Sequence, residues 1–242
     1  MKKKVLTAAL VLLMIALAVG GSLAFFTAED EVTNTFTLGS VSIEIWENGE
    51  ATNSDRVIFD KPMIPVVNEQ KITTDPGYVP KAVKVESTGE NAAYIRVHLA
   101  VPTALVEYLE LRMNPDDSGW NYIGTSDTKL VDGVAYTVKT YDYQEAVAPK
   151  AFTPELLLGA YLRSDVDTKD NPATPAEDLE FCKPDGDGYA FSGFVAHRKT
   201  ASGYSSNTVC ILVAAEAMQD RGFTDATTAL NTGFGENTNP WQ

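Results

Sequence analysis

Residues 93–101 read AYIRVHLAV and alternate between apolar and polar side chains. The apolar members share one parity: Ala93, Ile95, Val97, Leu99 and Val101. The polar members share the other parity: Tyr94, Arg96 and His98. Because successive side chains of a strand point to opposite faces of its sheet, this pattern predicts a β-strand with one buried face. We expect it to be a central strand, with His98 on the solvated face.

Other apolar runs lie on both sides of this strand and have the length of strands. Alternation at 41–45, 83–85, 134–138 and 189–195 predicts half-buried strands, and the near-continuous apolar run 208–218 predicts burial on both faces. The turn residues at 87–91 predict a hairpin between 83–85 and 93–101. Short strands separated by turns indicate an all-β fold, an antiparallel, jelly-roll-like β-sandwich with short inserted helices.

The helices and loops are expected at five places. Leu105, Leu109 and Met113 are spaced by four and predict a helix over 103–113, and Thr153-Pro154-Glu155 has the cap residue and proline of a helix start. One or two helical turns are expected at 225–230. The segment 164–188 is rich in Asp, Pro, Lys and Gly, which predicts an exposed acidic loop, and 233–242 is expected to be a flexible tail.

The first 24 residues have the order of a secretory signal peptide. Three lysines at positions 2–4 precede an apolar run, and small residues follow it. The run from Val5 to Val19 is shorter than the roughly 20 residues that a spanning helix needs. Residues 1–24 are therefore expected to be removed by cleavage between Ala24 and Phe25, so that the chain contacts the membrane only before cleavage. An uncleaved membrane anchor is the alternative.

Residues 25–40, which follow the expected cleavage point, alternate again. One parity carries the apolar side chains Phe26, Ala28, Val32, Phe36 and Leu38, interrupted by Asp30 and Asn34. The opposite parity is polar, as in a strand with one wet face. This segment is expected to be an N-terminal strand, followed by one β-sandwich domain over 41–232.

Charge limits the classes of partner that the chain is expected to have. It carries 33 acidic against 19 basic residues, a formal net charge of −14, and removal of the leader lysines makes it more acidic. Such a chain repels the phosphates of nucleic acids and anionic membrane surfaces. No nucleic-acid partner is expected.

The residue types of familiar catalytic sites are scarce. His98 and His197 are the only histidines and form no His-Glu-x-x-His pair, and no serine lies in a Gly-x-Ser-x-Gly elbow. Export would permit a disulfide between Cys182 and Cys210, but Cys210 lies in an apolar run where a free thiol packs equally well. The aspartates of 164–188 do not match the twelve-residue calcium loop, which leaves solvation or weak calcium binding. We predict a protein that is not an enzyme and has no catalytic, metal or cofactor-binding residues.

Three blocks of this sequence resemble the TasA/camelysin family of exported bacterial proteins. They are GGSLAFFT at 20–27 with NTFTLGSVSI at 34–43, PGY at 76–78 with KVESTGENAAYIRV at 84–97, and VAAEAMQ at 213–219. The blocks occur in family order and cover about a third of the chain.

The resemblance implies a SipW-type signal peptidase as processing partner and a secreted, jelly-roll subunit of extracellular biofilm-matrix fibres. In such fibres the freed N-terminal strand is added to the sheet of the next subunit, either of the same chain or of a related matrix protein. Phe26, Ala28, Val32, Phe36 and Leu38 are then the side chains that fill the neighbour's groove. The alternatives are that this strand folds back onto its own domain, that the protein is a camelysin-like cell-surface metalloprotease, or that it is a monomeric adhesin or sugar-binding module.

Overall fold

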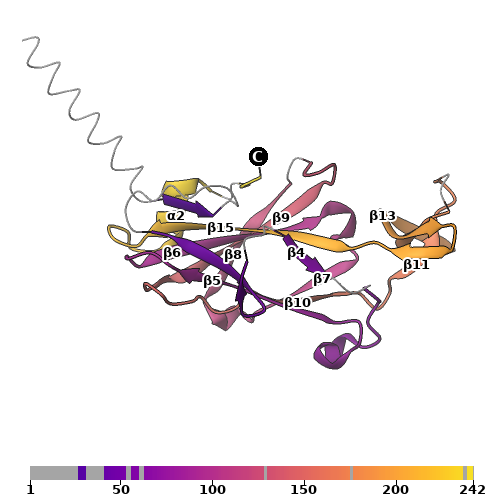
Figure 1. The fold of residues 1–242 in the computed structure, drawn as a ribbon, viewed down its shortest axis with the longest axis horizontal. Helices are drawn as coiled ribbons and strands as arrows, with labels where there is room; N and C mark the ends of the chain where they lie inside the picture. Colours follow the sequence, from indigo (N-terminus) through magenta and orange to yellow (C-terminus); the bar gives the residue numbers. More distant parts are fainter. Residues whose placement is uncertain are drawn as a thin grey trace, which may run out of the picture.

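The computed structural model describes residues 27–30, 41–52, 56–59, 63–127, 130–174, 177–236 and 239–241. Within these ranges the strands form antiparallel sheets, two of which pack face to face as a β-sandwich (Figure 1). The predicted fold class, an all-β sandwich with few helices, is confirmed. The expected signal peptide 1–24 lies outside the described residues.

The first sheet contains the predicted central strand. Its strand order is β1 (Thr27–Asp30), β15 (Val209–Gln219), β6 (Ala93–Pro102), β9 (Tyr136–Val147) and β8 (Trp120–Asp127), with β4 (Arg56–Phe59) also paired to β15. The second sheet has the order β3 (Glu50–Ala51), β2 (Ile43–Glu47), β5 (Val79–Ser87), β10 (Leu157–Leu162) and β7 (Leu109–Met113).

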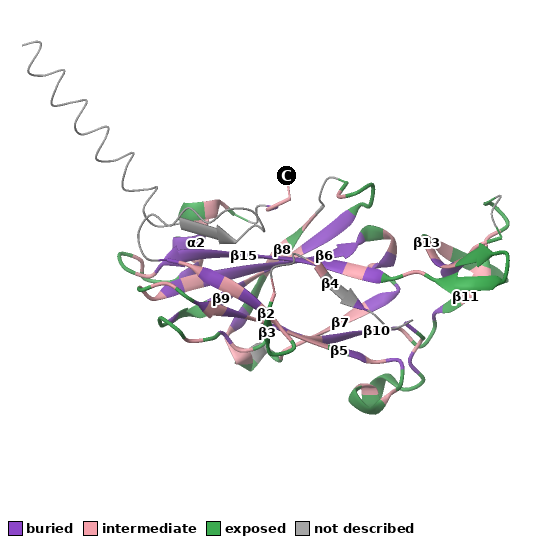
Figure 2. Ribbon diagram, in the orientation of Figure 1, coloured by how far each residue is buried: buried purple, intermediate pink, exposed green. Residues whose placement is uncertain are grey.

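The core lies between these two sheets. Ile95, Val97 and Leu99 of β6 are fully buried against Val83 and Val85 of β5, as the alternation in both strands predicted. Residues 211–219 of β15 are buried on both faces, which confirms the prediction for that run (Figure 2). Burial of apolar surface between the sheets therefore supplies the main stabilisation of the fold.

The expected hairpin between 83–85 and 93–101 is wrong. β5 belongs to the second sheet and β6 to the first, so the turn at 87–91 carries the chain across the sandwich. Two strands with one apolar face each can pair side by side or pack face to face, and alternation alone does not distinguish these arrangements.

The two helices expected in the middle of the chain are also wrong. Residues 103–105 form a single 3-10 turn, and the chain then enters β7. Leu109, Leu111 and Met113 alternate with Glu110 and Arg112, so the period of two was present beside the period of four.

Thr153 begins no helix. Its backbone amide donates to the carbonyl of Val85 in β5, and its hydroxyl accepts a hydrogen bond from the Val85 amide.

The segment 164–188, expected to be an exposed loop, contains two strands. β11 (Asp167–Asp170) and β12 (Leu179–Asp185) form a third sheet with β13 (Gly188–Thr200) and β14 (Gly203–Ser206) at one end of the molecule. Phe181 of β12 enters the main core, which anchors this largely exposed sheet.

Cys182 is buried and free, and no disulfide joins it to Cys210 of β15.

The predicted C-terminal helical turns are confirmed as α2 (Ala226–Phe234). Asp225 caps the helix by accepting a hydrogen bond from the amide of Thr228. Ala226, Ala229 and Leu230 pack on Met218, so α2 covers the face of the first sheet that points away from the second sheet. The expected flexible tail 233–242 differs from the structure in part, because Asn239 is buried and Trp241 packs on the same face.

The burial pattern predicts different effects for two matched leucine substitutions. Leu99→Ala, at a fully buried position, should lower the free energy of unfolding by about 2–5 kcal/mol because it leaves a cavity. Leu130→Ala, at a position 68% exposed, should change it by less than about 0.5 kcal/mol. Urea denaturation of both variants measures the difference, and equal effects would contradict the assignment of the core.

Candidate functional site

The outer edge of β15 is the place where the N-terminal strand meets the sandwich. On one side β15 pairs with β6 from Leu212 to Gln219. On the other side it pairs with two short strands, β4 along 209–212 and β1 along 215–218. Among the described residues, Val213 and Ala214 lie between these two partners. We call residues 213–219 on this side of β15 the strand slot.

β1 occupies the strand slot in antiparallel register. Its pairs are Thr27 with Met218, Ala28 with Ala217, Glu29 with Glu216, and Asp30 with Ala215. Of the predicted donor residues, the structure therefore places Ala28 in the slot, opposite a core residue. The others lie outside the described residues: Phe26, Val32, Phe36 and Leu38, together with the predicted cleavage residues Ala24 and Phe25.

Toward the core, the slot is lined by small side chains. Ala215 and Ala217 are 1% and 0% exposed and belong to the core cluster. Directly opposite residues of an antiparallel pair share a face, so position 28, opposite Ala217, is on the core face of the sheet. The other edge of the sheet differs, because the pairing of β8 shifts register between Tyr122 and Gly124. A bulge of this kind discourages pairing with a further strand.

A buried ion pair lies on the opposite face of the same sheet. The Arg96 guanidinium donates from Nε to Asp142 Oδ1 at 2.7 Å and from Nη2 to Asp142 Oδ2 at 3.0 Å, and both side chains are fully buried. It also donates to the side chain of Asn231 at 2.7 Å and to the carbonyl of Gly235 at 2.8 Å. These bonds satisfy the charge and fix the C-terminal end of α2 to the sheet.

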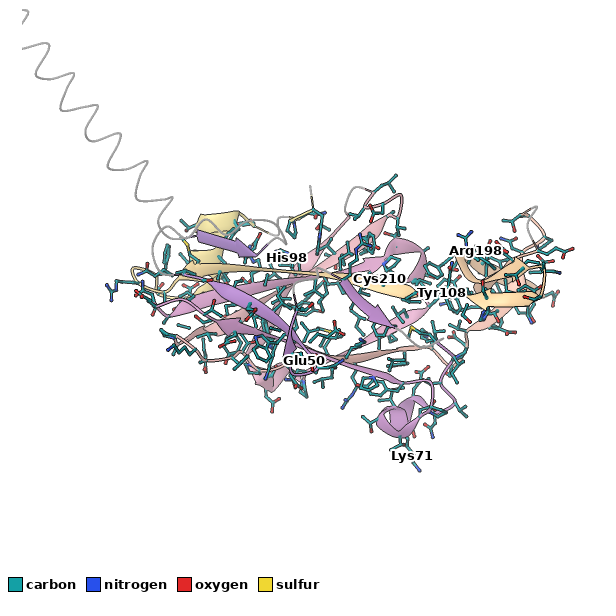
Figure 3. All side chains as sticks on the ribbon, viewed as in Figure 1. Glu50, Lys71, His98, Tyr108, Arg198 and Cys210 are labelled. Atoms are coloured by element: carbon teal, nitrogen blue, oxygen red, sulfur yellow. The ribbon has the colours of Figure 1, made fainter. Side chains whose placement is uncertain are left out.

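The surface position expected for His98 is wrong, because its side chain is fully buried on this face (Figure 3). Nδ1 lies 3.0 Å from the Thr140 hydroxyl, and Nε2 lies 3.3 Å from Oε2 of Glu216. The Trp241 ring covers the imidazole edge-on at a centroid distance of 6.4 Å. The polar parity of the strand was predicted correctly. The groups that cover the imidazole, Thr140, Glu216 and Trp241, come from distant parts of the chain, and the alternation of one strand carries no signal for them.

The pairing Thr140–His98–Glu216 connects a hydroxyl, an imidazole and a carboxylate. All three side chains are buried, at 0%, 0% and 4% exposure, under the C-terminal residues. The hydroxyl has no open approach for a substrate, so we interpret the trio as a structural network.

Burial raises the pKa of the Cys182 thiol, which keeps this cysteine protonated and unreactive near neutral pH.

Two further features of the described residues bear on ligands. Within the described ranges, no three His, Cys, Asp or Glu side chains are close enough to hold a metal ion. An open pocket of about 390 Å³ lies between the 3-10 turn at 103–105 and β13, with Tyr108 and Phe191 in its lining. The Tyr108 hydroxyl there is already engaged, because it donates to the carbonyl of Ala190 at 3.1 Å.

The comparisons with known proteins give no relative for this chain. No protein-family model, no curated protein and no solved structure matches it. In the part of the chain that the structure describes, no helix is long and apolar enough to cross a membrane.

The Arg96–Asp142 pair leads to a prediction about stability. Arg96→Met should lower the free energy of unfolding by about 3–5 kcal/mol, because it leaves Asp142 buried without its cation. The double variant Arg96→Met with Asp142→Leu should recover much of this loss, because neither charge is then buried alone. Urea denaturation of the two single variants and the double variant gives the coupling energy, and strictly additive losses would contradict the pairing.

Proposed function

We propose that this chain is a secreted structural subunit of extracellular matrix fibres, in which the N-terminal strand of one copy occupies the strand slot of the next. A SipW-type signal peptidase would release the strand, and the fibre would lie in the extracellular matrix or at the cell surface. The observation that carries the proposal is the position of β1, which adds to the first sheet at β15 through four residue pairs in the described part of the chain.

A short edge strand of this kind is exchangeable. Main-chain hydrogen bonds supply most of its affinity, and an identical strand from a second copy makes the same bonds with the same side chains. Exchange between copies adds no new type of contact, so the self-paired and the exchanged forms differ little in free energy. Because donation from one copy to the next is head-to-tail and does not close, it produces a filament.

The chain between β1 and β2 is long enough for such an exchange. Ten residues, 31–40, separate Asp30 from Val41, the first described residue before β2. An extended chain spans at most about 3.3–3.6 Å per residue, so this connection can reach roughly 35 Å from the sandwich. That distance is sufficient to place the strand on an adjacent copy.

The pairing of β4 with β15 limits the length of donor strand that we propose for the slot. β4 holds the edge of β15 along 209–212, which leaves 213–219 for a donor. If the register of β1 is kept in the fibre, residues 26–32 pair with these seven positions. The proposed donor segment 25–38 is longer, so we assign pairing to its first half and spanning between subunits to its second half.

The two alternative functions gain less from the described residues. A camelysin-like metalloprotease needs metal ligands, and His98 is held between Thr140 and Glu216. A sugar-binding module needs free polar groups beside an aromatic face, and Tyr108 in the open pocket is engaged with Ala190. Neither alternative explains an N-terminal strand at the sheet edge.

Cysteine trapping distinguishes exchange between copies from self-pairing. In a background of Cys182→Ala and Cys210→Ala, one copy carries Ala28→Cys and a second, differently tagged copy carries Ala217→Cys. Opposite positions of an antiparallel pair lie within the range that a disulfide bridges, so mixed fibres should give dimers that contain both tags. Denaturing gel electrophoresis without reductant measures them.

The matched control pairs Ala28→Cys with Ala214→Cys. Position 214 is three residues from the register partner and belongs to the other face of β15, so dimers with both tags should be rare. If 28 and 217 cross-link only when both cysteines are in the same chain, even in samples that contain fibres, the donation of strands between copies is refuted.

A further inference from the structure

We infer that residues 239–241 form a latch on the back of the strand slot, in which the Trp241 ring holds β15 ready to accept a strand. The latch acts within one chain, and its consequence for fibres rests on the proposed function. The observation that carries the inference is the position of Trp241, which packs on the first sheet at the level where β15 passes from β4 to β1.

The edge of β15 has the fewest strand partners at Val213 and Ala214. In the described part of the chain, β4 pairs with 209–212 and β1 pairs with 215–218, so these two positions lie between the partners. On the inner edge β6 pairs with both positions. Local opening of a sheet is easiest where strand partners are few, so contacts on the two faces of β15 matter most at this point.

Both faces of β15 are covered here. Toward the second sheet, Val213 is 1% exposed and belongs to the main core. On the opposite face, Leu212 is fully buried in a small apolar cluster. The other buried members of this cluster are Ala100, Tyr136 and Val138.

Trp241 closes this cluster from outside. The indole packs against the cluster and also lies edge-on to the His98 imidazole, at a centroid distance of 6.4 Å. His98 is the register partner of Ala214 on β6. The indole therefore covers the sheet directly behind the part of β15 that has the fewest strand partners.

A hydrogen bond within the latch sets the direction of the Trp241 backbone. The Asn239 side chain is 5% exposed, and its Oδ1 accepts a hydrogen bond from the Trp241 amide at 2.9 Å. This bond restricts the chain before the indole is placed, so less conformational entropy is lost when the ring packs on the sheet.

Release of the latch should weaken the hold of the slot on a strand. Without the indole, apolar surface of the cluster meets water, and β15 loses contacts that oppose local opening. A slot that opens more often is less pre-organised, and a less pre-organised site binds its partner less tightly. The effect applies to a strand from the same copy and to a strand from another copy.

Hydrogen exchange on the full processed chain tests the latch. Trp241→Ala removes the indole, and Phe152→Ala is the matched control. Phe152 is also a partly exposed ring in an edge-on contact, with Trp46 at 5.1 Å, and it lies beside β5 of the second sheet. Amide protection is measured by mass spectrometry for 211–217 of β15 and for 83–87 of β5.

Trp241→Ala should lower protection of 211–217 by about five- to tenfold relative to the control and leave 83–87 at the control level. Trp241→Phe, which keeps an aromatic ring, should recover part of the loss. Asn239→Ala, which keeps the indole and removes the hydrogen bond, should act in the same direction as Trp241→Ala. Unchanged protection of 211–217, or an equal fall in both segments, would overturn the inference, because an equal fall reports global stability alone.

The outcomes separate this inference from the proposed function. If Trp241→Ala loses protection at 211–217 but cysteine trapping finds no exchange between copies, the latch acts only within one chain and the fibre proposal fails. If copies exchange strands and Trp241→Ala behaves as Phe152→Ala, the fibre proposal stands and the latch is refuted.

Discussion

The backbone of β15 imposes the constraint on which the rest of the molecule depends. This strand is buried on both faces, and a buried strand needs hydrogen-bond partners along both of its edges. β6 supplies one edge from Leu212 to Gln219, whereas the other is divided between β4 and β1. Within the described residues, β1 closes this edge along 215–218, and in the fibre that we propose a strand of the same sequence from another copy takes its place.

The two faces of the first sheet use different physical chemistry. Toward the second sheet, Ala215 and Ala217 join an apolar core that tolerates an added strand. On the other face, Arg96 and Asp142 form a bonded charge network that holds α2, and His98 lies 3.3 Å from Glu216 beside it. The apolar face supplies stability, and the polar face fixes the C-terminal helix to the sheet.

The sequence predicted the elements whose pattern has a single structural interpretation. The alternation of 93–101, the apolar run of 208–218 and the helical turns near 225–230 all correspond to observed elements. It failed at 103–113, where periods of two and four coincide, and at 164–188, where Phe181 draws a polar segment into the core. Burial of His98 depends on Trp241, far along the chain, and local alternation cannot report such contacts.

The same reasoning explains how much of the site could be predicted. The amphipathic character of the N-terminal segment was evident in the sequence. Its pairing partner and register were not evident, because they depend on which edge of the sheet is open.

A side-chain resolution reconstruction of the fibres by electron cryomicroscopy tests the central claim most directly. The account predicts that the strand beside Ala215 and Ala217 continues into the neighbouring subunit. A strand that continues into β2 of the same subunit at every position along the fibre would contradict it.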